Sequence, residues 1–221
     1  PNASWDIRSN PIFKSVTVDN WFVIAPPRSR REVEEFVQMM ITVATPLDIN
    51  FGTPTIIESQ NYSTDYTKIL RTYIQPDTKL VMIILPNDKK DLYDSIKQIC
   101  INQCPVPSQC VVKRTIMNPK GLQSKATKIA VQIAAKVGGA PWTVDMNLNA
   151  PTMFVGMDVY HSGELVSRKK QSVVGFAASM NKSVTAYYSR VMIQDPGKEI
   201  VEELKPSMIA ALRKFTETNR L

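Results

Sequence analysis

The chain has 221 residues, 43% of them hydrophobic, and its 27 Lys and Arg outnumber its 20 Asp and Glu to give a formal net charge of +7. That length holds one large or two modest domains with a real core, and the hydrophobic content argues against disorder. No run reaches the ~18 to 20 apolar residues of a membrane span, and no signal peptide opens the sequence. The basic balance favours a polyanionic partner without identifying it.

The cysteines show no pattern of a metal or disulfide site. Cys100, Cys104 and Cys110 form an odd set without a C-x-x-C pair, and the sequence has a single histidine, His161. We therefore expect reduced thiols instead of a zinc site or a disulfide framework. Reduced thiols indicate a reducing compartment, the cytoplasm or the nucleus.

Strand patterns alternate with helix patterns between residues 20 and 137. Strands are predicted over 20–25, 54–59, 79–86 and 108–115, and helices over 33–41, 66–74, 93–97 and 128–137. The run KLVMIILP at 79–86 is apolar on both faces, as a central parallel strand should be. The alternation predicts an open α/β domain with a parallel sheet, and ligands in such sheets bind beyond the carboxyl ends of the strands.

Two polar stripes at helical spacing mark a candidate anion site. Tyr93 and Lys97 lie four residues apart, and Lys128, Gln132 and Lys136 repeat that step, so each set shares one helix face. An aromatic ring can stack on a base, and ammonium and amide groups can donate to a phosphate. The alternative is that these residues form solvated faces, with the last lysine interacting with its helix dipole.

After residue 142 the pattern changes to three consecutive strands and a helix. The strands are predicted over 152–160, 171–179 and 185–194, and their short connections favour antiparallel pairing. The helix is expected from about Gly197, with Pro206 kinking or splitting it.

Asp158 stands out within the first of these strands. By period-two alternation it shares a face with Phe154, Gly156 and Tyr160. Burying a carboxylate in an apolar strand is costly unless hydrogen bonds or a metal compensate. Asp158 is therefore either a metal ligand or a structural aspartate with satisfied hydrogen bonds.

Several ordered motifs resemble one known family. The runs YDSIK, CPVPSQCVVKRT and KIAVQIAAKVGGAPW are similar to the MID domain of the Argonaute superfamily, in its Piwi clade. FVGMDVYH, SVVGFAASM and YYSRVMIQDPGKEIVEELK resemble the start of the adjoining PIWI domain, which has an RNase H-like fold. The resemblance implies a linker over 1–17, a Rossmann-like MID domain with a parallel sheet over 18–145, and the N-terminal part of a PIWI domain over 146–221.

The resemblance also implies a ligand. In the family the MID domain anchors the 5′-phosphate and first base of a single-stranded guide RNA, here of the piRNA type that directs transposon silencing in the germline. Carried over residue by residue, Tyr93 stacks on the first base, while Lys97, Gln109 and Lys136 bind the phosphate. Gln132 falls where other Argonautes have a lysine, and in Piwi proteins Mg²⁺ then helps to neutralise the phosphate.

A catalytic role is implied for two acidic residues. Asp158 matches the first acidic residue of the family's RNA-cleaving tetrad, and Glu199 matches the glutamate that completes it. Metal-dependent cleavage needs several such ligands, and the family's next aspartate would follow Leu221. We therefore expect this stretch of chain not to cut RNA.

Three functions stay open at this point. We favour guide-RNA binding. The second is that the chain is a piece of a piRNA-guided, metal-dependent endoribonuclease that acts on target RNA. The third is a platform that binds silencing proteins, and none of the three involves a membrane.

Overall fold

The computed structural model describes residues 10–61, 64–161, 171–195 and 203–221. The chain divides into two compact units between Trp142 and Thr143. We call the N-terminal part unit 1 and the C-terminal part unit 2. Within the described ranges, no helix has the length and apolar character needed to cross a membrane.

Unit 1 is built on a four-stranded parallel sheet in the order β4-β2-β5-β6. Its strands are β2 (Trp21–Ala25), β4 (Thr55–Glu58), β5 (Leu80–Leu85) and β6 (Ser108–Val112). All residues of β2 and β5 are buried, because each of these strands has a neighbour on both edges and helices over both faces. The predicted parallel sheet, with 79–86 as a central strand, is confirmed.

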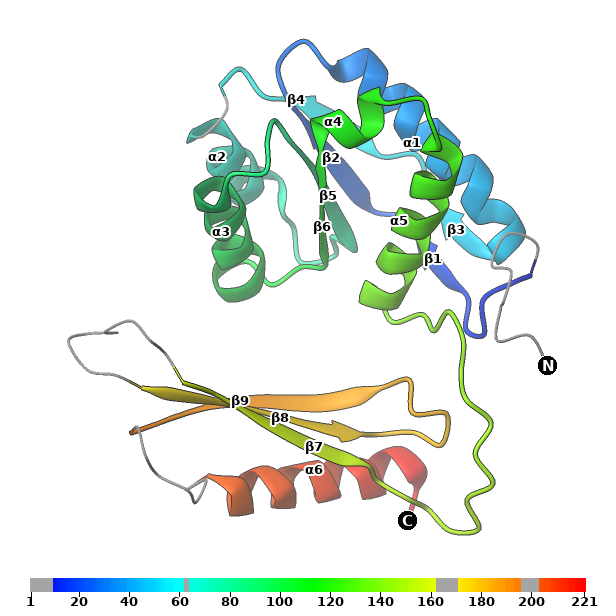
Figure 1. Ribbon diagram of the computed structural model, residues 1–221, viewed down its shortest axis with the longest axis vertical. Helices are drawn as coiled ribbons and strands as arrows, with labels where there is room; N and C mark the ends of the chain where they lie inside the picture. The colour runs from blue at the N-terminus through cyan, green and yellow to red at the C-terminus, as the bar shows by residue number, and fades with distance from the viewer. Residues whose placement is uncertain (1–9, 62–63, 162–170, 196–202) are drawn as a thin grey trace. The chain divides into compact units, whose positions relative to one another are not determined.

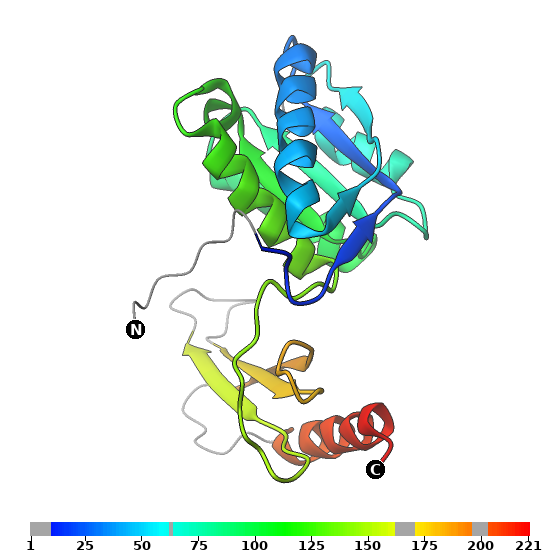
Figure 2. The same ribbon diagram turned by 90° about the vertical axis from the view of Figure 1, so that its right-hand side faces the viewer.

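Helices cover both faces of this sheet (Figure 1). They are α1 (Arg30–Ala44), α2 (Thr64–Tyr73), α3 (Lys90–Gln98) and α5 (Leu122–Lys136). Helices α1 and α5 lie side by side over one face, where Val23 and Met82 join their core (Figure 2). Helices α2 and α3 cover the other face, where Ile24 and Ile83 point. Successive residues of these strands therefore pack into two separate cores, one on each face of the sheet.

The strand predicted over 108–115 is too long. β6 ends at Val112, and the short helix α4 (Lys113–Met117) follows at once. Val112 pairs with Leu85, the last residue of β5. The next residue of the partner strand is Pro86, which has no backbone N–H to continue the ladder.

Four small elements besides α4 were not predicted. A two-stranded parallel sheet joins β1 (Val16–Val18) to β3 (Ile49–Phe51), so its first strand begins within the segment interpreted as a linker. A 3₁₀ turn, η1 (Thr45–Leu47), follows α1, and a π-helical turn, η2 (Ile99–Gln103), extends α3. Each is too short to produce a periodic pattern in the sequence.

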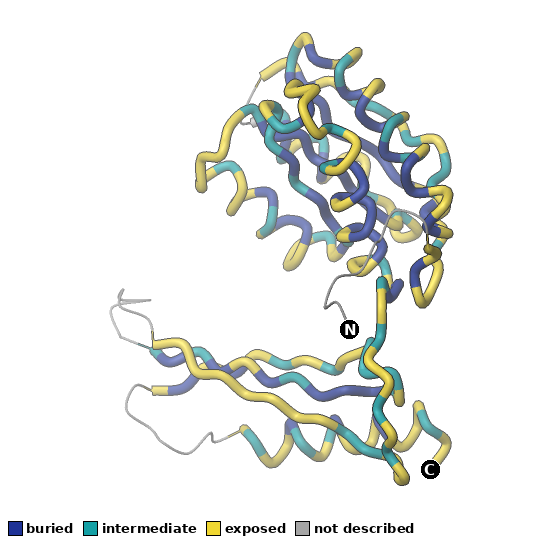
Figure 3. The backbone as a smooth tube through the Cα atoms, turned by 45° about the vertical axis from the view of Figure 1, so that its right-hand side comes forward, coloured by how far each residue is buried: buried dark blue, intermediate teal, exposed yellow. Residues whose placement is uncertain are grey.

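Unit 2 is a three-stranded antiparallel sheet with a helix on one face. The strands β7 (Val155–His161), β8 (Ser172–Ser179) and β9 (Tyr187–Gln194) follow one another in space as in sequence, as predicted. Helix α6 (Leu204–Asn219) packs over β8 and β9. Their shared core contains Phe176, Met192 and Phe215. β7 stays exposed along its whole length (Figure 3).

Pro206 lies in the first turn of α6. The helix begins at Leu204, and its first intrahelical hydrogen bond runs from the Ser207 N–H to the Glu203 carbonyl at 3.1 Å. A first-turn residue has no intrahelical acceptor for its N–H, so a proline is tolerated there. Pro206 therefore fits within the first turn of α6 without interrupting it, and the stretch from Gly197 to residue 202, where the helix was expected to begin, falls outside the described residues.

The burial of β5 leads to a stability prediction. Ile83→Ala should lower the free energy of unfolding of unit 1 by about 2 to 5 kcal/mol, since it leaves a cavity in a packed core. Ile101→Ala, at a side chain that is 64% exposed, is the matched control. Urea unfolding followed by tryptophan fluorescence reports on unit 1, because all three tryptophans precede residue 143. Equal losses in the two variants would contradict the buried position of β5.

Candidate functional site

The residues predicted to bind phosphate meet at the beginning of β6. Lys97 lies in the last turn of α3 and Lys136 in the last turn of α5, while Ser108 and Gln109 are the first two residues of β6. In this alternating architecture the helices run opposite to the strands, so their C-terminal ends gather at the amino ends of the strands. The expectation of a site beyond the carboxyl ends of the strands is therefore wrong for these residues.

Two lysines converge on one backbone carbonyl. The Lys97 Nζ donates to the Ser108 carbonyl oxygen at 3.2 Å and to the Ser108 Oγ at 2.7 Å. The Lys136 Nζ donates to the same carbonyl at 3.0 Å and to the Gln109 Oε1 at 2.8 Å. Neither ammonium group has a carboxylate partner among the described residues. Two like charges thus stand beside each other without neutralisation.

Two glutamines extend this arrangement. The Gln109 Nε2 donates to the Cys110 carbonyl at 3.2 Å and lies 3.4 Å from the Gln132 Oε1. Gln109 is only 6% exposed, whereas Gln132 faces solvent. We call Lys97, Ser108, Gln109, Gln132 and Lys136 the lysine cluster. Lys128, an exposed residue one turn before Gln132, takes no part in its hydrogen bonds.

Tyr93 borders the lysine cluster on its outer side. Its side chain is 42% exposed, and the Lys97 Nζ lies 5.7 Å from the centre of its ring, within the range of a cation–π contact. An exposed ring beside a cation offers a surface on which a base can stack. The exposure also agrees with the alternative of a solvated helix face, so the stacking role of Tyr93 stays a prediction.

Partial desolvation shifts the pKa of one lysine, and burial shifts the pKa values of two nearby thiols. Desolvation lowers the pKa of Lys136 below the ordinary lysine value, and the positive charge of Lys97 lowers it further. Burial raises the pKa of Cys110 to about 11, and it also raises the pKa of Cys100. Both thiols are therefore neutral at neutral pH and supply no negative charge to the lysines.

The helix ends explain why two lysines stand here. Each helix C-terminus carries about half an elementary negative charge, which favours a lysine in the last turn. An anion at this end of the helices would be repelled by both dipoles. Lys97 and Lys136 together bring two positive charges, which outweigh the dipoles and make the surface attractive to an anion.

Sequence reasoning missed Ser108. A serine at the start of a strand has neither charge nor helical spacing to draw attention to it. Only the tertiary structure reveals that both lysines bind its carbonyl and that one of them also binds its hydroxyl.

The burial expected for Asp158 is wrong. Asp158 is exposed, as is every residue of β7, and α6 packs on the other face of the sheet. Its Oδ1 accepts a hydrogen bond from the Val159 N–H at 3.0 Å. The register pairs Asp158 with Gly175, on the sheet face opposite α6. Because Asp158 is exposed, its carboxylate needs no metal to compensate for burial. Its metal role therefore stays a prediction from the resemblance alone.

The proposed partner of Asp158 cannot be placed, because Glu199 lies outside the described residues. Among the residues that are described, no three His, Cys, Asp or Glu side chains come close enough together to hold a metal ion.

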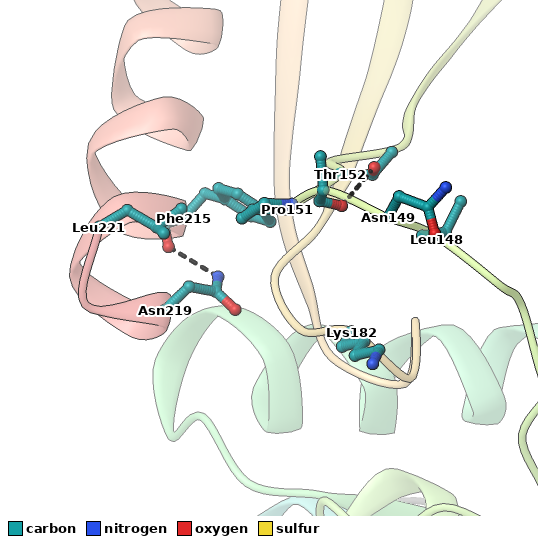
Figure 4. Close-up of a pocket in the computed structure, with 9 residues that line it drawn as sticks. Leu148, Asn149, Pro151, Thr152, Lys182, Phe215, Asn219 and Leu221 are labelled. Carbon is teal, nitrogen blue, oxygen red and sulfur yellow. Dashed lines mark hydrogen bonds between the residues drawn. The ribbon is translucent and has the colours of Figure 1, made fainter.

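A separate pocket of about 300 Å³ lies in unit 2 (Figure 4). It is lined by Leu148, Asn149, Ala150, Pro151, Thr152, Lys182, Phe215, Asn219 and Leu221. The Asn219 amide is already engaged, because it donates to the carbonyls of Met180 and Phe215. None of the predicted site residues lines this pocket.

The lowered pKa of Lys136 can be measured. In the free protein the pKa of Lys136 should lie below the ordinary lysine value, and Lys97→Ala should raise it by removing a neighbouring positive charge. Lysine-selective ¹⁵N NMR as a function of pH follows the Lys136 ammonium group. A Lys136 pKa that is ordinary in the wild type and unchanged in Lys97→Ala would contradict the effect of desolvation and of the neighbouring charge.

Sequence comparison identifies the family. The chain matches the Piwi domain over residues 80–221. Piwi-like protein 1 of Gallus gallus is 36% identical over 220 residues, which cover 99% of this chain and 25% of that protein. The chain therefore spans about a quarter of the length of this relative.

Structural comparison agrees with this result. The crystal structure of Drosophila Piwi superposes with a TM-score of 0.86 at 27% identity, over 97% of this chain and 29% of that one. The crystal structure of Kluyveromyces polysporus Argonaute with a guide RNA gives a TM-score of 0.73 at 20% identity, over 95% of this chain and 27% of that one. The second likeness shows the fold alone. Together these matches establish that the chain belongs to the Piwi clade of the Argonaute superfamily.

Proposed function

We propose that this chain binds the phosphorylated 5′ end of a single-stranded guide RNA of the piRNA type at the lysine cluster. The observation that carries this proposal is the convergence of Lys97 and Lys136 on the Ser108 carbonyl without a carboxylate. A terminal phosphate carries close to two negative charges at neutral pH and would supply the missing counter-charge. Membership of the Piwi clade supports an RNA ligand, since a related Argonaute was crystallised with a guide RNA.

Tyr93 gives the site a place for the first base. Its exposed ring stands four residues before Lys97 on the same helix and in contact with that lysine. A base that stacks on this ring brings its own 5′-phosphate toward the ammonium groups. Stacking accepts any base, so this contact binds an RNA end without reading its sequence.

Mg²⁺ is part of the proposal at Gln132. Mg²⁺ prefers oxygen ligands, keeps several waters and commonly binds through substrate phosphates. The exposed amide of Gln132 offers such an oxygen, whereas the cluster contains no carboxylate. The residues present therefore fit an ion that arrives together with the RNA phosphate. When bound, the ion would supply positive charge beside a neutral residue.

The wider role follows from the RNA ligand. We propose that the parent protein acts in RNA-guided silencing inside the cell, where the anchored guide pairs with target RNA and further silencing proteins assemble on the complex. A phosphate-independent interaction with RNA would instead favour the protein-platform function.

The phosphate preference tests the proposal directly. The wild-type chain should bind a short 5′-phosphorylated RNA more tightly than its 5′-hydroxyl counterpart. Lys97→Ala should lower the affinity for the phosphorylated RNA by roughly ten- to hundredfold and leave the affinity for the hydroxyl-ended RNA unchanged. A loss of this size is expected when a charge-assisted hydrogen bond is removed. Lys214→Ala removes the same charge from unit 2 and is the matched control. Equal losses for both RNA ends in Lys97→Ala would refute the role of this lysine.

The role of Mg²⁺ has its own test in the same titration. Chelation of divalent ions should reduce the phosphate preference of the wild type. Gln132→Lys should retain that preference in chelator, because the new ammonium group replaces the charge of the ion. Gln123→Lys, on the exposed side of the same helix, controls for the added charge. If wild-type binding is insensitive to chelator, Gln132 is not associated with a metal.

A further inference from the structure

We infer that Ser108 is the positioning residue of the lysine cluster, which holds both ammonium groups ready for the phosphate without touching the RNA itself. This inference rests on the proposed function, because positioning has a purpose only if an anion binds there. Nothing in the sequence pattern marks Ser108, and the inference comes from its contacts.

Ser108 binds Lys97 at two points. The Lys97 Nζ donates to the Ser108 Oγ at 2.7 Å and to its carbonyl oxygen at 3.2 Å. The same carbonyl accepts from the Lys136 Nζ at 3.0 Å. One residue therefore provides three of the acceptor contacts that the two lysines make. The remaining acceptor is the Gln109 side chain, which is bound only by Lys136.

The backbone of Ser108 is a rigid support. Ser108 is 6% exposed and pairs with Val81 of the fully buried strand β5. The Val81 N–H donates to the adjacent Pro107 carbonyl at 2.9 Å, which fixes the chain just before the serine. The acceptors of Ser108 are thus held by the sheet itself and not by a loop.

The hydroxyl of Ser108 is fully engaged on the protein side. An ammonium group has only donors, so the Oγ must accept from Lys97. The Ser108 side chain also lies close enough to the buried thiol of Cys100 to lower the pKa of that thiol, against the larger effect of burial. Ser108 therefore lies between a buried thiol and a half-buried ammonium group, and it has no need of an RNA contact to be satisfied.

Positioning matters because the two lysines repel each other. A lysine has a flexible four-carbon stem, and ordering it costs conformational entropy. Without the Oγ contact, Lys97 could swing away from Lys136 toward solvent. The phosphate would then have to bring the two charges back together, and affinity for the phosphate would fall while contacts to the rest of the RNA remained.

Three serine variants test the inference in the titration of phosphorylated and hydroxyl-ended RNA. Ser108→Ala should reduce the ratio of the two affinities by about tenfold, as expected for one lost hydrogen bond to a charged group. Ser108→Thr retains the hydroxyl and should preserve the ratio. Ser95→Ala removes an exposed hydroxyl from α3 that bonds only the Asp91 carbonyl, and it should change nothing.

Lysine-selective ¹⁵N NMR of the RNA-free chain gives a second readout. The ammonium protons of Lys97 should exchange slowly with solvent in the wild type and in Ser108→Thr, and faster in Ser108→Ala. An unchanged affinity ratio in Ser108→Ala, with wild-type phosphate preference intact, would overturn the inference and leave the proposed function standing. If the wild type shows no phosphate preference, the proposed function fails. In that case, an unchanged exchange rate of the Lys97 ammonium protons in Ser108→Ala would overturn the positioning role as well.

Discussion

The pairing of β6 with β5 is the constraint on which the lysine cluster depends. β5 is buried between two helical layers, and its register with β6 sets Ser108 opposite Val81 at the amino end of the sheet. Because the helices run against the strands, the last turns of α3 and α5 arrive at the same end from opposite faces. The start of β6 is thus the place where a lysine from each layer can reach one carbonyl oxygen.

This placement has an electrostatic consequence. Many phosphate sites use helix N-termini, where the dipole attracts an anion. The lysine cluster stands at helix C-termini, so only side-chain charge can attract an anion there. The thiols of Cys100 and Cys110 are neutral and therefore do not offset the positive charge of the lysines. Desolvation and the positive charge of Lys97 lower the pKa of Lys136. In the proposed function, the negative charge of a bound phosphate would oppose both effects.

Unit 2 shows how a sequence pattern and a local structure can disagree. The apolar residues of β7 predicted burial, yet Met157 is 46% exposed and Tyr160 is 66% exposed. Met157 lies on the face that carries α6, but α6 packs over the other two strands, whereas Tyr160 lies on the opposite face. The sheet face that carries Asp158 also exposes Val191 and Ile193 of β9. Within the described part of unit 2, no three His, Cys, Asp or Glu side chains come together, so the metal role of Asp158 stays a prediction.

The sequence by itself determined the longer helices and strands and which residues share a face within them. Alternating strand and helix patterns predicted the parallel sheet, helical spacing set Tyr93 beside Lys97 and Gln132 beside Lys136, and the family motif added Gln109. These features are local, because a helix turn or a strand period depends on residues a few positions apart. Only the tertiary structure decided where β6 ends, that Asp158 is exposed, and that Ser108 binds both lysines. Those outcomes depend on which distant segments pair and pack, and residues 97, 108 and 136 share no sequence period that could reveal their meeting.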